Sequence, residues 1–199
     1  MYEIVVIGTS WGGLNALTQV VSGLPATFAL PLVVVQHRSP DTPGFLAELL
    51  QTHTRLRVVE VDDKRPIAAG HVYVAPSNYH LLIESGFFSL TTDAPVRYSR
   101  PSIDVTFVSA ADEYGRHTVG VVLTGANEDG ALGLKRIVDR GGYAIVQDPA
   151  TAEGVAMPRA ALLAVPKARV VPLGRIADHL ITIAPPRPPA EHRVRAPLA

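Results

Sequence analysis

Short apolar runs rich in β-branched residues alternate along the chain with stretches in which apolar residues recur every three or four positions. The runs predict strands and the stretches predict helices. In the first third of the chain the predicted order is strand, helix, strand, helix, strand, over residues 2–8, 12–22, 30–37, 42–51 and 55–61. Asp41 or Thr42 is the expected cap of the helix at 42–51. Such an order is typical of a parallel sheet with helical crossovers.

The middle of the chain has a different pattern. Three apolar runs at 71–76, 79–85 and 87–92 are separated only by Ser-Asn and by a single glycine, which predicts an antiparallel ribbon. Helices and strands then alternate again. The predicted helices are 101–115, 128–142, one starting at Pro158 and one at 174–183, and the predicted strands are 118–125, 143–148 and 168–172.

We therefore expect one α/β domain over residues 1–184. It contains a single doubly wound, mostly parallel sheet with helices on both faces and a short antiparallel ribbon in the middle of the chain. A chain of 199 residues, 47% of them hydrophobic and 18% charged, is long and apolar enough to bury a substantial core. Residues 185–199 are rich in proline and mildly basic, and we expect them to form a disordered tail.

Composition excludes several classes of function. The chain has 18 basic and 18 acidic residues and a formal net charge of zero, so nothing favours binding to nucleic acid or to an anionic membrane. It has no cysteine, which excludes disulfides, thiolate catalysis and cysteine-bound metals.

No ligand cluster stands out, so we expect neither a metal nor a cofactor. The N-terminus has no basic leader, and no apolar run approaches the ~20 residues of a membrane span. A cytoplasmic monomer is the expectation.

The first predicted turn, in VVIGTSWGGLNAL, has two interpretations. Gly8, Ser10 and Gly13 occupy the three glycine positions of a dinucleotide-binding fingerprint, with serine in place of the second glycine. The next strand ends in Gln36-His37-Arg38 and offers no carboxylate for a ribose. The dinucleotide interpretation is therefore weak. The alternative is a sharp turn that presents Ser10 as a nucleophile.

Two further residues favour the nucleophile. His37 ends the second strand, and Asp129 follows a later strand in a glycine-rich turn that opens a helix. The carboxyl ends of parallel strands meet at one edge of the sheet, so the serine, the imidazole and the carboxylate of a catalytic triad would converge there. Taken singly, Ser10 could cap a helix, His37 could be an ordinary strand-end histidine, and Asp129 could complement a helix dipole. Their convergence favours catalysis.

Six motifs in order and spacing resemble the catalytic domain of the chemotaxis protein-glutamate methylesterases, the CheB family. They are IGTSWGG, VVVQH, YVAPSNYHLLI, RPSID, LTGANEDGALGL and VQDPATAEGVAMPRAA, and the resemblance runs from about residue 3 to residue 183. It implies that Ser10 is the nucleophile, His37 the general base and Asp129 its orienting acid. It also implies hydrolysis of glutamate γ-methyl esters on the cytoplasmic region of methyl-accepting chemoreceptors, and deamidation of receptor glutamines in some members.

The chain departs from the family pattern in three ways. Ala126 and Asn127 stand where the resemblance favours a TGMG stretch, and Trp11 replaces a small residue beside the nucleophile. We expect Trp11, Gly12 and Ala126 to line the oxyanion and substrate site. The resemblance also implies that a typical member has an N-terminal receiver domain whose phosphorylation regulates activity, and we expect none in this chain. This chain starts at the catalytic strand, as either a stand-alone member or a fragment would.

Two other hypotheses remain open. The triad could hydrolyse another ester or amide, or the fold could serve as a non-catalytic signalling scaffold. Ser102 and Asp104 of RPSID are interpreted as a helix cap rather than as substrate contacts. Arg38 is a candidate for steering an acidic partner, although an arginine at such a position is usually solvated.

Overall fold

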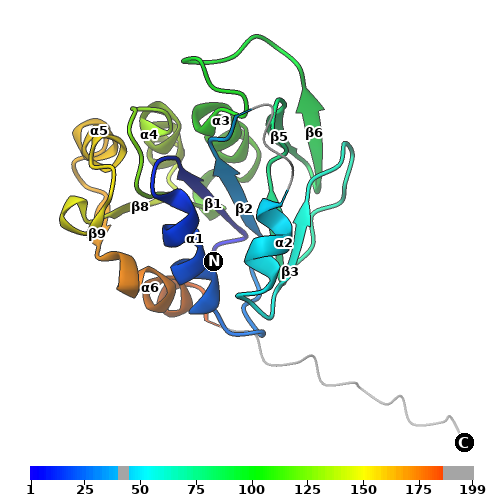
Figure 1. Cartoon of the computed structure of the whole chain (residues 1–199), viewed down its shortest axis with the longest axis horizontal. Coiled ribbons are helices and arrows are strands. Elements are labelled where there is room, and N and C mark those ends of the chain that lie inside the picture. Colours follow the sequence, from blue (N-terminus) through cyan, green and yellow to red (C-terminus); the bar gives the residue numbers. More distant parts are fainter. Residues whose placement is uncertain (40–44, 186–199) are drawn as a thin grey trace, which may run out of the picture.

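A seven-stranded sheet runs through the centre of the protein. The computed structural model describes residues 1–39 and 45–185, and Figure 1 shows the sheet between two layers of helices. All pairs in the sheet are parallel, and the strand order is β3-β4-β2-β1-β7-β8-β9. The strands are β1 (Ile4–Thr9), β2 (Leu32–Gln36), β3 (Arg57–Glu60), β4 (His71–Val74), β7 (Thr118–Val122), β8 (Tyr143–Gln147) and β9 (Arg169–Val171). A separate antiparallel pair contains β5 (His80–Glu84) and β6 (Phe87–Thr91).

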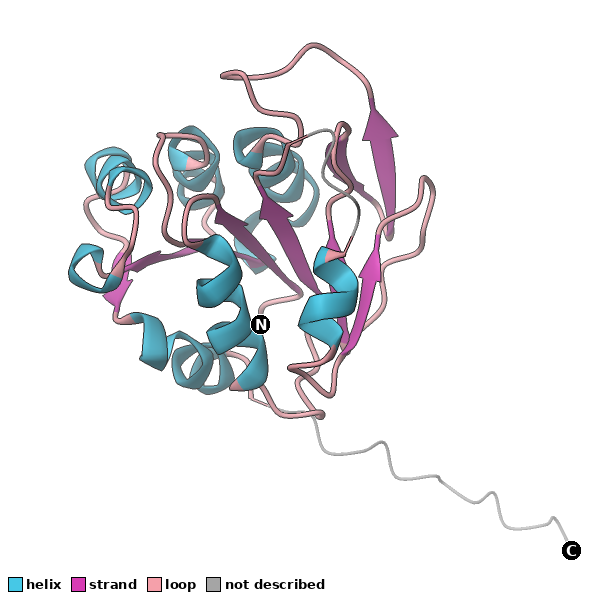
Figure 2. Cartoon of the chain, viewed as in Figure 1, coloured by secondary structure: helices cyan, strands magenta, loops and turns pink. Residues whose placement is uncertain are grey.

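The helices cover both faces of the sheet, as Figure 2 shows. Apolar side chains of α1, α2 and α6 pack on one face and those of α3, α4 and α5 pack on the other, so the sheet separates two hydrophobic cores. The helices are α1 (Gly13–Ser22), α2 (Leu46–Gln51), α3 (Ile103–Tyr114), α4 (Ala131–Asp139), α5 (Ala156–Ala164) and α6 (Ile176–Ile183). Short 3₁₀ turns lie at Gly115–His117, Pro149–Thr151 and Leu173–Arg175.

Local sequence explains the central elements. All six residues of β1 are buried, as expected for a strand with helices on both faces. The α1 helix buries Ala16, Leu17, Val20 and Val21, a spacing that places them on one helix face. The α3 helix begins at the cap Ser102, as the sequence predicted.

The doubly wound α/β fold with a short antiparallel ribbon is confirmed, but the prediction assigned one strand wrongly. Segment 71–76 was expected in the ribbon, and instead β4 lies in the parallel sheet between β3 and β2. Residues 72–75 of this segment are buried without alternation, because helices or loops cover both faces of the strand. The ribbon consists of β5 and β6 alone.

Some predictions fall on residues outside the described ranges. These are the caps Asp41 and Thr42 of the second helix and nearly all of the tail at 185–199. Within the described part of that helix, α2 begins at Leu46. None of the helices in residues 1–39 and 45–185 is long and apolar enough to cross a membrane.

The strand order places the carboxyl ends of β2, β1 and β7 side by side. The chain moves outward from β1 to one side through β2, and to the other side through β7. Ligand sites of doubly wound sheets lie at such a reversal, outside the carboxyl ends of the strands.

Candidate active site

Ser10 lies directly after β1, in a turn that is anchored to the loop after β7. Its backbone N–H donates to the carbonyl of Thr124 at 3.0 Å, and the hydroxyl of Thr9 donates to the same oxygen at 2.9 Å. Gly12 has φ +74°, a left-handed conformation that glycine adopts without strain. A Cβ on Gly13 would lie 2.2 Å from Oε1 of Gln36. Both glycines are therefore required where the turn enters α1.

His37 follows β2 and is held beside the serine by the backbone. Its N–H donates to the carbonyl of Thr9 at 3.1 Å. The carboxamide Nε2 of Gln36 donates to the carbonyl of Ser10 at 2.8 Å and to that of His37 at 3.1 Å. One side chain thus joins the turn that carries the serine to the strand end that carries the imidazole.

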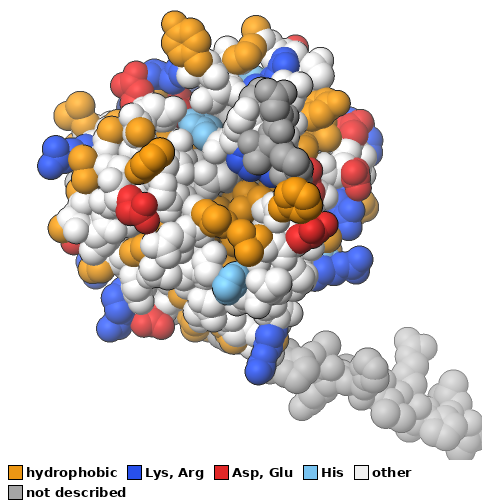
Figure 3. Space-filling view, in the orientation of Figure 1, with side chains coloured by type: hydrophobic (Ala, Val, Ile, Leu, Met, Phe, Trp, Pro, Cys, Tyr) orange, Lys and Arg blue, Asp and Glu red, His pale blue; other side chains and the backbone are white. Residues whose placement is uncertain are grey.

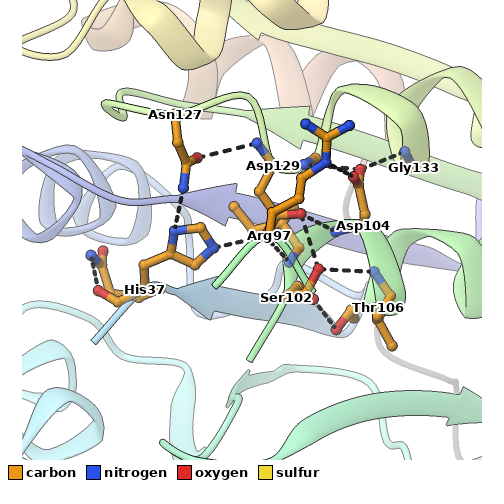
Figure 4. Close-up of polar contacts among 12 residues, drawn as sticks. His37, Arg97, Ser102, Asp104, Thr106, Asn127, Asp129 and Gly133 are labelled. Atoms are coloured by element: carbon orange, nitrogen blue, oxygen red, sulfur yellow. Dashed lines mark hydrogen bonds and ion pairs between the residues drawn. The ribbon is translucent and has the colours of Figure 1, made fainter. Parts of the chain in front are cut away.

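Asp129 is buried behind His37, and its Oδ2 lies 2.7 Å from Nε2 of the imidazole. The carboxylate accepts three more hydrogen bonds at the beginning of α3, from the Ser102 hydroxyl at 3.0 Å and from the backbone N–H groups of Ile103 and Asp104 at 2.7 and 3.0 Å. Figure 4 shows this arrangement.

The pKa of Asp129 reflects two opposed effects. Burial raises it, but the hydrogen bonds from His37 and from the backbone of Asp104 and Ile103 outweigh burial and hold the pKa below its ordinary value. A helix N-terminus also favours a negative charge. Asp129 is therefore a buried carboxylate that stays ionised and can orient the imidazole.

Asp104 is a second buried carboxyl group near Asp129. It accepts hydrogen bonds from the backbone N–H groups of Gly130 at 2.9 Å and Gly133 at 2.7 Å, at the beginning of α4. Burial raises the pKa of Asp104, and the neighbouring charge of Asp129 adds to the increase. The guanidinium of Arg97 lies 3.8 Å away and opposes it. Asp129, just before α4, thus accepts hydrogen bonds from the first turn of α3, and Asp104, in α3, accepts hydrogen bonds from the beginning of α4. The two carboxyl groups join the two helices in this way.

The interpretation of Ser102 and Asp104 as a helix cap is incomplete. Ser102 caps α3, with its hydroxyl 3.5 Å from the N–H of Val105, and it also donates to Asp129. A serine at this position predicts a helix cap, but nothing in the sequence indicates that the capped helix would meet the turn after β7. That contact depends on how α3 packs against α4, which a local pattern does not encode.

Asn127 contacts both the His37 ring and the backbone of Asp129. Its Oδ1 accepts from the N–H of Asp129 at 3.1 Å, and its Nδ2 lies 3.4 Å from Nδ1 of His37. Since Nε2 of the ring faces Asp129, Nδ1 is the nitrogen left for a reacting group. Within the described residues the Ser10 hydroxyl makes no hydrogen bond to the ring. Catalytic hydrogen bonds are often long before substrate binds.

A groove of about 550 Å³ brings the serine and the imidazole together on one surface. Trp11, Gly12 and Ala126 also line it, where the sequence predicted them. Among the described residues, the backbone N–H groups of these three find no hydrogen-bond partner. They are free to donate to a substrate oxygen. No group of His, Asp or Glu side chains able to hold a metal ion occurs in the described part of the chain.

Apolar side chains surround this part of the surface. The Trp11 side chain is exposed at the groove, and α1 and α2 leave Leu14, Phe45 and Leu49 exposed. Figure 3 shows apolar side chains gathered on the face between these two helices. Clustered exposed apolar groups are typical of surfaces that contact another protein.

Arg38 does not lie where the sequence suggested. Its side chain is only 8% exposed and pairs with Glu60 at 3.1 Å. The expectation of a solvated arginine is wrong, because β3 and β4 place Glu60 and the carbonyl of Ala75 around the guanidinium.

Comparisons with known proteins agree with this geometry. The family model described as CheB methylesterase matches residues 5–180. The crystal structure of the Thermotoga maritima CheB methylesterase catalytic domain superposes with a TM-score of 0.88 at 34% identity, covering 92% of this chain and 99% of that one.

Two relatives show the same similarity in sequence. A Leptospira interrogans protein is 45% identical over 183 residues, which are 92% of this chain and 95% of that protein. The protein-glutamate methylesterase/protein-glutamine glutaminase 1 of Carboxydothermus hydrogenoformans is 41% identical over 184 residues, 89% of this chain and 54% of the relative. The chain thus spans nearly all of one relative and about half of the other.

Proposed function

The chain belongs to the CheB methylesterase family, and on this premise we propose that Ser10, His37 and Asp129 are the catalytic triad of a carboxylic ester hydrolase. The observation that carries the proposal is the 2.7 Å contact between His37 and the buried Asp129, on the ring that shares a groove with Ser10. The substrates are γ-methyl esters of glutamate side chains in proteins. Glutamine side chains are a second substrate, as the name of the Carboxydothermus relative supports.

The reaction begins at the ring nitrogen that does not face Asp129. Nδ1 of His37 takes the proton of the Ser10 hydroxyl while Oγ forms a bond to the ester carbonyl carbon. The tetrahedral intermediate carries a negative oxygen. The free backbone N–H groups of Trp11, Gly12 and Ala126 are the donors available to bind it.

Collapse of the intermediate breaks the bond to the methoxy group. The imidazolium of His37 returns the proton, and methanol leaves. Water then attacks the acyl-serine with His37 as base, which releases the glutamate carboxylate and restores Ser10. With a glutamine side chain the same steps release ammonia.

Asp129 acts through the imidazole. Its carboxylate accepts a hydrogen bond from Nε2–H, which leaves Nδ1 unprotonated and able to act as base, and it stabilises the imidazolium that forms. The α3 N-terminus keeps Asp129 ionised, so the acid does not take the proton itself. Ser102 belongs to this arrangement as a positioning residue.

We further infer that the protein acts in the cytoplasm as a monomer, on the cytoplasmic region of methyl-accepting chemoreceptors, without binding nucleic acid or inserting into a membrane. The formal net charge of zero supports the absence of nucleic-acid binding. The exposed apolar surface beside the groove supports contact with a protein substrate. Residues 1–184 would form the whole catalytic domain.

Methanol release from methylated chemoreceptor fragments tests the proposal. We expect release by the wild type, loss by about a thousandfold or more in Ser10→Ala, and no loss in Ser22→Ala. The Ser22 hydroxyl is exposed on α1 and donates to the carbonyl of Gln19. If the wild type hydrolyses p-nitrophenyl hexanoate through Ser10 but no receptor fragment, the triad stands and the substrate is wrong. If neither compound is hydrolysed, the scaffold hypothesis replaces the enzyme.

A further inference from the structure

A small pocket adjoins the Ser10 groove at His37. It has a volume of about 120 Å³, and His37 lines both it and the groove. Its remaining lining residues are Arg38, Asn78, Pro95, Tyr98, Ser99, Arg100 and Pro101. Two of them are arginines and none is acidic, so the lining is positively charged.

Arg38 is not fully satisfied within the protein. Its Nη2 donates to Glu60 at 3.1 Å and to the carbonyl of Ala75 at 2.7 Å. Its Nε and Nη1 are buried and have no hydrogen-bond partner among the described residues. A buried N–H without a partner is costly, and charged groups cost more than neutral ones. A buried group of this kind needs an explanation, and an anionic partner is one that suits a guanidinium.

Arg100 adds a second charge that the protein does not neutralise. Its guanidinium donates to Oδ1 of Asn78 and to the carbonyls of Thr92 and Asp93. All of these acceptors are neutral, and no ion pair of Arg100 occurs in the described part of the chain. Glu60 neutralises the charge of Arg38 but not that of Arg100, so the pocket retains one excess positive charge.

We propose that this pocket binds a carboxylate of the substrate protein while the methyl ester occupies the groove. The proposal rests on the proposed function and extends it to substrate selection. A carboxylate fits a pocket lined by two arginine side chains, because guanidinium groups form strong charge-assisted hydrogen bonds with it. The carboxylate belongs either to a permanently acidic side chain near the ester or to a glutamate that an earlier turnover of the reaction has produced.

Two esters with acyl chains of equal length test the proposal. p-Nitrophenyl hexanoate is neutral, and mono-p-nitrophenyl adipate ends in a carboxylate. The measured quantity is the ratio of kcat/KM for the adipate to that for the hexanoate, at constant ionic strength. We expect Arg38→Gln to lower this ratio about tenfold, since it removes charge-assisted hydrogen bonds.

Glu60→Gln gives the opposite expectation. It leaves the guanidinium in place but removes its internal counter-charge, so the ratio should rise about threefold or more. A purely structural Arg38–Glu60 pair would instead make both variants change in the same direction or leave the ratio unchanged, which would overturn the proposal. Arg55→Gln is the matched control, because it also removes one arginine. Arg55 is exposed and precedes β3, at the amino ends of the parallel strands, whereas Arg38 follows β2 at their carboxyl ends.

The measurements distinguish failure of the pocket proposal from misfolding of a variant and from failure of the proposed function. If circular dichroism shows that Arg38→Gln does not fold, Glu60→Gln decides the question, since it retains Arg38. If hydrolysis of neither ester depends on Ser10, the proposed function fails. If hydrolysis depends on Ser10 but the ratio is equal in wild type, Arg38→Gln and Glu60→Gln, only the pocket proposal fails.

A methylated receptor fragment distinguishes the two sources of the carboxylate. Its other acidic residues are changed to glutamine, and wild type is compared with Arg38→Gln. If the variant is now as fast as wild type, the pocket binds an acidic side chain near the ester. If the demethylated product still inhibits Arg38→Gln less strongly than it inhibits the wild type, the pocket binds the carboxylate that the reaction forms.

Discussion

Gln36 is hydrogen-bonded to the backbone of Ser10: its Nε2 donates to the carbonyl of Ser10 at 2.8 Å, and also to that of His37 at 3.1 Å. Thr9 and Gln36 are paired in the register of β1 and β2, so Ser10 and His37, the proposed nucleophile and base, follow directly from a matched pair of positions. The strands set the approximate separation, and the carboxamide fixes the turn relative to the strand end.

Gln36→Leu should therefore lower kcat as well as stability. Removing the donor frees the Ser10 turn, and we expect kcat to fall about three- to tenfold while the free energy of unfolding changes by about 1 kcal/mol. Steady-state kinetics and urea denaturation measure the two quantities. Gln19→Leu, on the exposed face of α1, should change neither. An unchanged kcat together with a lower free energy of unfolding would show a merely structural role.

Ser102→Ala should affect both the helix cap and the triad. Loss of the cap costs about 1 kcal/mol, measured as a lower urea midpoint. Loss of the hydroxyl also leaves Asp129 with one donor fewer, which raises its pKa and should lower kcat about tenfold. Unchanged kcat with a lower midpoint would restrict Ser102 to capping. The control is Ser22→Ala, which also removes one serine hydroxyl.

The pH dependence of stability should reveal the ionised Asp129. Its pKa is lower in the folded protein than in the unfolded chain, so its stabilising contribution is complete above the unfolded value of about 3.9 and is lost as pH falls through the folded value. We expect the urea midpoint of the wild type to decrease steeply below about pH 4.

Asp129→Asn provides the comparison for that measurement. It should be less stable than wild type at pH 7 but should show a flatter decrease below pH 4, because the titrating group is gone. Asp139→Asn, which removes an exposed carboxylate paired with Lys135 on α4, should retain the wild-type profile. A profile for Asp129→Asn parallel to that of wild type would contradict the lowered pKa.

Gly133 permits the close packing of α3 on α4. A Cβ at this position would lie 2.5 Å from Cβ of Phe107 and 3.1 Å from backbone atoms of Asp104. Gly133→Ala should therefore destabilise the protein by about 1–3 kcal/mol, seen in thermal denaturation. Gly174→Ala is the matched control, because a Cβ there meets nothing within 4 Å. Equal melting temperatures in the two variants would show that α3 and α4 can separate without cost.

The positions of the candidate site residues at strand ends could be predicted from the sequence. Ser10, His37 and Asp129 follow β1, β2 and β7, and apolar runs identify such strands well. The hydrogen bonds of Asp129 with the first turn of α3 were not predicted, because they depend on packing between helices. The burial of Arg38 escaped prediction for the same reason, since its partner Glu60 lies on a strand that is not its neighbour in the sheet.

The central position of β1 has a consequence for how the enzyme is made. The hydrogen bond from the Thr9 hydroxyl to the carbonyl of Thr124 spans 115 residues, and β1 finds its β7 partner across a similar separation. During synthesis the strand that carries Ser10 therefore emerges long before one of its edges can be paired. Contacts so distant in sequence slow folding and leave a β edge open to aggregation. Shortened chains that end before β7 should thus precipitate rather than retain partial activity, and the nascent chain is a natural client for a chaperone.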